Sequence, residues 1–244
     1  MNRTVLITGA SRGIGAAAAR AFVGEGDRVA VNFFQSRREA EQLCEELCGD
    51  KGAVMAVRAD VSDAAQVEEM FCKVEAQFGT VDVLVNNAGI ARTELVQDVT
   101  DEQWRQMFAV NVDGIFYCCR RALPAMIRGG QGNIVNLSSV WGLVGASCEV
   151  AYSAAKAAVI GLTKALAKEV GPSGIRVNCV APGVVDTDMN AALDEYTRAE
   201  LREETPLGAL GTPADVAEAI LFLASERAHF ITGQVLSPNG GFVI

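Results

Sequence analysis

The feature that most constrains this chain is an alternation of short apolar runs with helical segments, which continues almost from end to end. The runs are rich in β-branched residues, and they cover residues 4–8, 28–34, 53–59, 81–85, 132–137, 175–181 and 234–237. Segments of helical character lie between them, at residues 16–24, 36–47, 62–78, 101–127, 152–170 and from 212 onward. Strands that alternate with helices form parallel sheets with helices on both faces. We therefore predict an α/β fold with a doubly wound parallel sheet.

No linker, low-complexity run or internal repeat divides the 244 residues. Half of the residues are apolar and 24 are glycine, which suits a buried parallel sheet with many tight turns. We expect residues 1–244 to form a single domain. Residues 184–210 interrupt the alternation, because they are polar and charged with little periodicity. We interpret this stretch as a lid over a substrate pocket, and a solvated helical excursion is the alternative.

A glycine-rich turn, Gly9-x-x-x-Gly13-x-Gly15, follows the first strand directly and opens the first helix. Glycine lets the backbone approach a pyrophosphate closely, and the unpaired N–H groups at a helix start favour its negative charge. Between a strand and a helix of a doubly wound sheet, this spacing indicates a dinucleotide site. The fold is therefore expected to be of the Rossmann type.

The end of the second strand bears on the choice of dinucleotide. A site for NAD commonly places a carboxylate there to hold the ribose 2′-hydroxyl. Here residues 32–38 read Asn-Phe-Phe-Gln-Ser-Arg-Arg, and no carboxylate precedes Glu39. Arg12 in the glycine turn, with Arg37 and Arg38, offers cations for a 2′-phosphate. We expect NADP(H) in preference to NAD(H).

A second pattern lies between the fifth strand and the following helix. Tyr152 and Lys156 are four residues apart, so both lie on one helix face, and Ser139 lies where the strand gives way to a loop. A phenol has an ordinary pKa of about 10, and a nearby ammonium lowers it toward the neutral range. The serine hydroxyl can hydrogen bond the same oxygen that the tyrosine protonates. The pattern indicates a proton donor for a carbonyl.

Charge and composition exclude several classes of protein. The net charge of −9 and the pI near 4.8 argue against nucleic acid and anionic membranes as partners. No run approaches the roughly 18 unbroken apolar residues of a membrane helix. The N-terminus has no signal-peptide layout, so we expect a cytoplasmic protein. His229 is the one histidine and no Cys-x-x-Cys occurs, so no metal site is expected.

Taken together, the motifs resemble those of the classical short-chain dehydrogenases/reductases, in the same order and over nearly the whole chain. They are Thr8-Gly9-x-x-x-Gly13-x-Gly15, Asp60-Val61, Asn86-Asn87-Ala88-Gly89, Asn111, Ser139, Tyr152-x-x-x-Lys156 and Pro182-Gly183. The resemblance implies that Tyr152 is the general acid and that Ser139 orients the substrate oxygen. It also implies that Lys156 lowers the pKa of the tyrosine and holds the nicotinamide ribose, while Asn111 holds a water in a proton relay.

The same resemblance implies the cofactor contacts. Asp60 and Val61 are expected along the adenine, and residues 87–89 beneath the cofactor. The full set of expected contacts is Gly9, Ser11, Arg12, Gly13, Ile14, Gly15, Asn32, Arg37, Asp60, Val61, Asn87, Ala88, Gly89, Tyr152, Lys156, Pro182, Gly183, Val185 and Thr187.

Within the family the likeness is greatest to bacterial reductases of 3-oxoacyl groups on acyl carrier protein, which implies NADPH-dependent reduction of a 3-oxoacyl thioester. Residues 128–132 and 171–174, however, are poor in the cations that such enzymes often use for the acidic carrier. A carbonyl, alcohol, sugar or hydroxysteroid dehydrogenase acting on a free small molecule is the alternative. A non-catalytic cofactor-binding regulator is a remote one.

The family is commonly tetrameric, and we expect a homotetramer. Apolar stretches at residues 107–126 and 150–166 could form subunit contacts or belong to the core.

Overall fold

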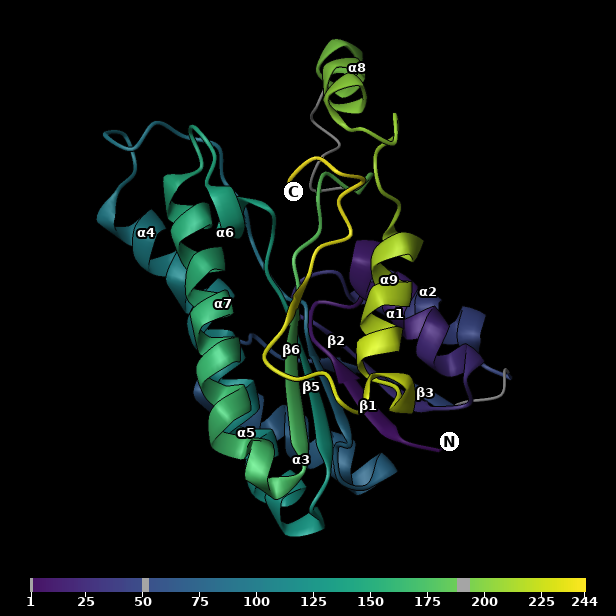
Figure 1. Ribbon diagram of the computed structural model, residues 1–244. Helices are drawn as coiled ribbons and strands as arrows, with labels where there is room; N and C mark the ends of the chain where they lie inside the picture. The colour runs from purple at the N-terminus through teal and green to yellow at the C-terminus, as the bar shows by residue number, and fades with distance from the viewer. Residues whose placement is uncertain (1, 50–52, 188–193) are drawn as a thin grey trace.

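The computed structural model describes residues 2–49, 53–187 and 194–244. Its strands form one sheet in the order β3-β2-β1-β4-β5-β6-β7 (Figure 1). Their bounds are β1 Thr4–Ile7, β2 Arg28–Phe33, β3 Ala53–Arg58, β4 Val83–Asn86, β5 Gly132–Leu137, β6 Ile175–Val180 and β7 Val235–Leu236. Every neighbouring pair of these strands is parallel. The predicted doubly wound parallel sheet is confirmed.

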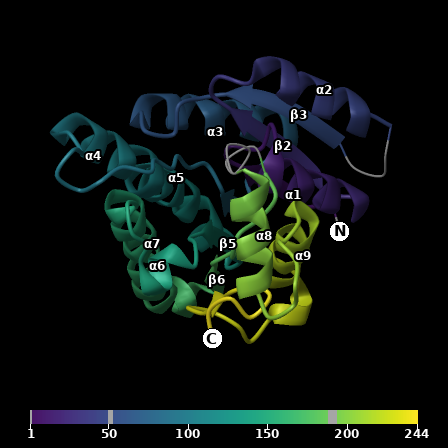
Figure 2. The same ribbon diagram turned by 90° about the horizontal axis from the view of Figure 1, so that it is seen from above.

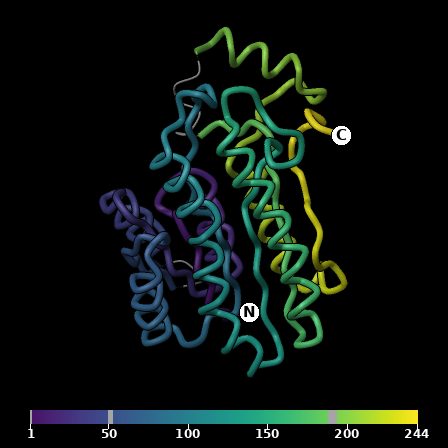
Figure 3. Tube along the Cα trace, turned by 90° about the vertical axis from the view of Figure 1, so that its left-hand side faces the viewer, coloured from purple at the N-terminus to yellow at the C-terminus, as the bar shows by residue number. Residues whose placement is uncertain are grey.

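Helices cover both faces of the sheet (Figure 2). One layer holds α1 (Gly13–Gly24), α2 (Arg37–Leu47) and α9 (Pro213–Leu223). The other holds α3 (Ala64–Phe78), α5 (Gly114–Gly129) and α7 (Val150–Val170), and Figure 3 shows α5 and α7 running side by side along this face.

The sheet separates two apolar cores, because successive strand residues point to opposite faces. Val5 and Ile7 of β1 join the core beneath α1 and α9, and Leu6 joins the core beneath α3, α5 and α7.

The predicted helix over residues 101–127 is wrong in one respect. The structure has α4 (Asp101–Phe108), a π-helical turn (Ala109–Asp113) and then α5, which continues through Pro124 without ending there. Asn111 explains the irregular turn, since its Nδ2 donates to the Met107 carbonyl at 3.0 Å. That carbonyl is the normal acceptor for the backbone N–H four residues later, and such competition widens the helix locally.

Helix α6 (Trp141–Val144) was not predicted, whereas α8 (Glu195–Glu204) agrees with the helical excursion given as the alternative for residues 184–210. Helix α8 lies within the stretch 184–210 and stands beyond the carboxyl edge of the sheet (Figure 1). Its charges are paired, Arg198 with Asp186 and Arg202 with Glu195, each at 2.8 Å. Residues 188–193 of the expected lid lie outside the described residues.

By length and mean hydropathy alone, Val150–Ser173 would qualify as a membrane span. This segment contains α7, whose buried face includes Ala155, Val159 and Ile160 and packs against the sheet. The segment is the core helix of an α/β domain.

Candidate active site

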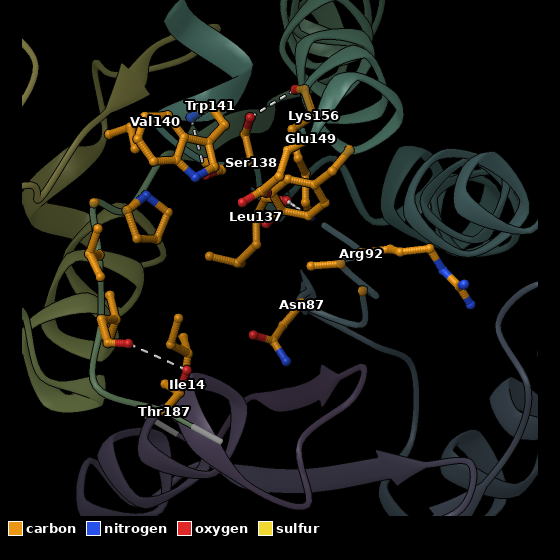
Figure 4. Close-up of a pocket in the computed structure, with 18 of the residues that line it drawn as sticks. Ile14, Asn87, Arg92, Leu137, Ser138, Val140, Trp141, Glu149, Lys156 and Thr187 are labelled. Atoms are coloured by element: carbon orange, nitrogen blue, oxygen red, sulfur yellow. Dashed lines mark hydrogen bonds between the residues drawn. The ribbon is translucent and has the colours of Figure 1, made fainter. Parts of the chain in front are cut away.

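A cavity of about 260 Å³ opens at the carboxyl ends of β1, β4, β5 and β6 (Figure 4). The chain crosses from one half of the sheet to the other between β1 and β4, and ligands of open parallel sheets bind at such a crossing. The predicted site residues that line the cavity are Ile14, Asn87, Gly89, Ser139, Tyr152, Lys156, Pro182, Gly183, Val185 and Thr187. The predicted residues that do not line it are Gly9, Ser11, Arg12, Gly13, Gly15, Asn32, Arg37, Asp60, Val61, Ala88 and Asn111.

Tyr152 and Lys156 lie in the first two turns of α7, and both are buried, with 8% and 4% of their surfaces exposed. The Lys156 Nζ lies 5.6 Å from the centre of the Tyr152 ring. Ser139 follows β5, where the Trp141 backbone N–H donates to its Oγ at 3.2 Å. These contacts bring the three predicted residues to one wall of the cavity.

The pKa of Tyr152 differs from the sequence-based expectation. Burial raises it to about 12, because the phenolate loses its solvation, and a hydrogen bond with the Ser139 side chain offsets only part of this effect. The negative charge of Glu149 raises the pKa further. The net shift is thus opposite to the expected one, because burial outweighs the influences that favour the phenolate, and the effect of Lys156 stays a prediction. The phenol is fully protonated at neutral pH.

Burial shifts the pKa of Lys156 in the opposite direction from that of Tyr152. Burial lowers its pKa to about 8, since the ammonium form loses solvation, and the charge of Cys179 raises it slightly. Its Nζ donates to the Leu137 carbonyl at 2.8 Å, so the amine is held at the end of β5. Near pH 7 the lysine still carries its positive charge beside the phenol.

Asn111 is fully buried in the π-helical turn and holds the loop that follows β4. Its Nδ2 donates to the Ile90 carbonyl at 2.9 Å, and its Oδ1 accepts from the Ile90 N–H at 3.2 Å. Gly89 leaves room between this side chain and the lysine, because a Cβ there would lie 2.6 Å from the Asn111 Oδ1 and 3.4 Å from the Lys156 Nζ. Glycine is thus required for the amide to approach the amine.

The glycine turn is bound to the loop after β4. The Thr8 Oγ1 accepts the backbone N–H groups of Asn87 and Ala88, each at 3.0 Å. The Asn87 Nδ2 donates to the carbonyls of Thr8 and Gly9, each at 2.9 Å.

The space in front of α1 suits a pyrophosphate. Gly13 has φ 56°, and a Cβ on it would point across the crevice to Thr187, 3.6 Å from its methyl group. A side chain at this position would occupy the space before the helix N-terminus, where backbone N–H groups favour an anion. The residues present therefore fit a dinucleotide.

Asn32 and Asp60 turn inward. The Asn32 Oδ1 accepts from the Gly9 N–H at 3.2 Å, and its Nδ2 faces the carbonyls of Val57 and Ala59. The Asp60 carboxylate accepts from the Ser62 N–H and hydroxyl at 2.9 and 2.7 Å. The Asn32 side chain thus fixes the glycine turn, and the Asp60 side chain fixes the loop before α3. Neither side chain lines the cavity.

The cations near the end of β2 are arranged differently from the sequence-based expectation. Arg37 is exposed and paired with Glu41 at 2.8 Å. Arg58, which was not predicted, pairs in register with Phe33 at the end of β3 and donates to the Phe34 carbonyl at 3.2 Å. Arg12 is exposed at the start of α1. Arg58 thus lies beside the end of β2, and Arg12 lies at the N-terminus of α1.

Nine lining residues were missed, and the charged or large aromatic ones among them are Arg92, Trp141 and Glu149. Trp141 and Glu149 lie between Ser139 and Tyr152, and Arg92 lies just beyond Gly89. No apolar period or glycine spacing marks them. Their nearness to predicted residues along the chain was the available signal.

Comparisons with known proteins agree over nearly the full length. A family model described as Enoyl-(Acyl carrier protein) reductase matches residues 9–243. A 3-oxoacyl-[acyl-carrier-protein] reductase of Staphylococcus aureus is 43% identical over 241 residues, which cover 99% of this chain and 98% of the relative. The corresponding reductase of Chlamydia muridarum is 42% identical over 244 residues, with 99% and 97% coverage. The crystal structure of such a reductase from Brucella melitensis superposes with a TM-score of 0.93 at 37% identity, and covers 99% of this chain and 92% of that one.

A Rossmann-type sheet whose crossing point carries a glycine turn and a buried Tyr–Lys pair is the architecture of a nicotinamide-dependent oxidoreductase. Given matches of this extent, the chain belongs to the short-chain dehydrogenase/reductase family. It is an oxidoreductase acting on a CH–OH group and the corresponding ketone, and the non-catalytic alternative is set aside.

The contact at Gly89 yields a first prediction. The Gly89→Ala variant should displace Asn111 or Lys156, and because small misplacements at a reacting centre are costly, kcat should fall about 100-fold. Steady-state kinetics measures this. Gly24→Ala is the matched control, since a Cβ there meets nothing within 4 Å. Equal kcat in the two variants would show that the spacing is not needed.

The buried lysine yields a second prediction, on stability. Below pH 8 the native protein carries a buried charge, and between pH 8 and pH 10.5 the unfolded chain holds a proton that the native protein has lost. Lys156 should therefore contribute a rise of the free energy of unfolding with pH over this window. Lys156→Met removes this contribution to the slope and should stabilise the protein at pH 7 by about 1–2 kcal/mol, after loss of the hydrogen bond to Leu137.

Denaturant unfolding at a series of pH values measures this effect. Lys164→Met on the exposed face of α7 is the control and should leave the slope unchanged. A Lys156→Met variant that is less stable than the unmodified protein at pH 7 would refute the prediction.

Proposed function

We propose that this chain uses NADPH to reduce the ketone of a 3-oxoacyl thioester to the 3-hydroxyacyl thioester. This proposal rests mainly on the phenol of Tyr152. Burial keeps the phenol protonated at neutral pH, and it shares one cavity with Ser139 and Lys156. A proton donor of this kind is what ketone reduction requires. The names of the Staphylococcus and Chlamydia relatives, which specify 3-oxoacyl groups, support the substrate class.

The roles of the side chains follow from their positions. Tyr152 gives its proton to the ketone oxygen as negative charge develops there, and Ser139 donates a hydrogen bond to that same oxygen. The Lys156 ammonium, held by the Leu137 carbonyl, favours the phenolate that remains. The nicotinamide, when bound, supplies the hydride.

Asn111 is proposed to be a positioning residue, which acts through the loop after β4 and through Lys156. Its amide fixes the loop after β4, and its Oδ1 is brought near the Lys156 amine by the absence of a side chain at Gly89. A water between the amide and the amine would complete the proton relay expected from the family.

The cofactor would be held from the glycine turn to the loop after β6. Gly13 and Gly15 would admit the pyrophosphate to the start of α1, and residues 87–89 and 182–187 would flank the nicotinamide. NADPH is favoured over NADH because residues 34–36, at the end of β2, carry no carboxylate, while Arg58 lies beside this end and Arg12 lies in the glycine turn.

The expected contact with an acidic carrier protein is weakened by the composition of one surface, which two turns form. Residues 128–132 and 171–174 touch, since a Cβ on Gly174 would meet the Gly130 carbonyl. Arg128 is the one cation of these two stretches. This surface offers little to an acidic carrier protein, so the thioester would be recognised chiefly in the cavity. It also favours the second candidate, a dehydrogenase of free small ketones, sugars or hydroxysteroids.

Assembly, location and the lid are part of the proposal. Exposed apolar side chains on α4, α5 and α7, namely Trp104, Phe116 and Val150, support subunit contacts in a homotetramer. The net charge of −9 is consistent with a cytoplasmic protein. The stretch 184–210 would close over the cavity, with α8 as its outer part.

The substrate and cofactor are tested in one assay. Purified protein should oxidise NADPH with an acetoacetyl thioester at least tenfold faster than NADH, since a difference of about 1.4 kcal/mol suffices for that ratio. The panel includes free ketones and a crotonyl thioester, because the matching family model is named for enoyl reduction. Activity on free ketones alone would replace the thioester with the second candidate, and activity on the crotonyl thioester alone would refute ketone reduction.

The proton donor is tested by Tyr152→Phe. This variant should bind NADPH as the unmodified protein does and lose turnover by about 100-fold to 10,000-fold, the usual contribution of a positioned acid. Fluorescence titration of NADPH and steady-state kinetics measure the two quantities. Tyr196→Phe, an exposed tyrosine of α8, is the control. Near-normal turnover of Tyr152→Phe would remove the proposed mechanism.

A further inference from the structure

Glu149 lies at the start of α7, three residues before Tyr152, and lines the cavity (Figure 4). Among the described residues that line the cavity, the charged side chains are Arg92, Lys156 and Glu149, so Glu149 is the acidic one. Two backbone hydrogen bonds, one at Cys148 and one at Glu149 itself, hold the backbone of Glu149 in place. The Cys148 carbonyl accepts from the Glu94 N–H at 2.7 Å, and the Glu149 carbonyl accepts from the Ser153 N–H at 2.8 Å.

The two cations of the cavity have partners elsewhere. The Lys156 amine donates to the Leu137 carbonyl, and the Arg92 guanidinium lies 3.9 Å from the Glu94 carboxylate. Within the described part of the chain, no group hydrogen bonds or pairs with the carboxylate of Glu149. This carboxylate is half-buried, and burial raises its pKa above the ordinary value. The cavity thus contains one partly desolvated carboxylate, that of Glu149, which has no hydrogen-bond or ion-pair partner among the described residues.

We propose that Glu149 is a specificity-determining residue that selects substrates by charge, rejecting ketones that carry a carboxylate and favouring neutral or cationic ones. The inference rests on the ketone reduction proposed above. A carboxylate on the substrate would meet a like charge that is partly removed from solvent, where charges interact more strongly than in bulk water. A thioester is neutral, whereas the free 3-oxo acid formed by its hydrolysis is anionic. Glu149 therefore distinguishes an activated acyl group from its hydrolysis product.

The aromatic wall of the cavity supports the same preference. Trp141 also lines the cavity and packs edge-on against Phe242, with ring centres 5.7 Å apart. An indole face attracts cations and accepts neutral groups. A carboxylate would find neither a free cation nor a favourable ring face on this side of the cavity.

Three ketones that share the 3-oxobutanoyl group test the proposal: acetoacetate, methyl acetoacetate and acetoacetylcholine, with charges of −1, 0 and +1. We would compare Glu149→Gln with Glu45→Gln, which removes the same charge from the exposed side of α2. In Glu149→Gln, kcat/KM should rise about tenfold for acetoacetate and fall about tenfold for the choline ester, relative to the methyl ester. In the unmodified protein the discrimination should weaken as the pH falls and Glu149 is protonated, and in Glu149→Gln it should not.

Ratios among the three ketones that stay within twofold of those of the Glu45→Gln control would overturn the inference. Reduction of the methyl ester by the unmodified protein reports separately on the proposed function. If the unmodified protein reduces no ketone or thioester, the proposed function fails, and the inference that rests on it fails with it.

Discussion

The geometry of this enzyme depends on a small set of hydrogen bonds between the ends of β1 and β4. One hydroxyl, that of Thr8, accepts two backbone N–H groups from the loop after β4, and the Asn87 amide donates back to the carbonyls of the glycine turn. The two halves of the sheet diverge at this place. Because the turn and the loop are joined here, the position of the expected pyrophosphate site fixes the position of Gly89, and through it the spacing of Asn111 and Lys156.

Burial then determines the chemistry. The same loss of solvation moves Tyr152 and Lys156 toward their neutral forms, so their pKa values change in opposite directions from their ordinary values. A protonated phenol suits ketone reduction, and a lysine that keeps its charge near pH 7 suits the phenolate left behind. The arrangement costs folding stability, as is common where activity needs a charge inside a protein.

The predicted sheet is confirmed, because its strands follow from local apolar period. The Tyr–Lys–Ser group, which was predicted from spacing, lines one cavity, and its catalytic role stays a prediction. What the sequence missed depends on partners distant in the chain. Asn32 was expected to contact cofactor, yet the carbonyls of Val57 and Ala59 in and after β3 draw its amide inward. The pKa of Tyr152 was misjudged because burial is a property of the folded protein. The π-helical turn arises from competition for a single carbonyl, which leaves no mark on apolar periodicity.

That turn has a consequence for how this chain tolerates change in length. A π-helical turn holds one residue more than an α-helical turn, so α5 is out of phase with the continuation of α4 by about 100°. Met107 of α4 joins the small apolar cluster with Tyr152, whereas Ile115 of α5 packs in the core beneath the sheet. Loss of one residue between 109 and 113 would restore a regular helix and rotate one of these surfaces away from its partner. The number of residues between α4 and α5 is thus as constrained as the identity of the residues that line the cavity.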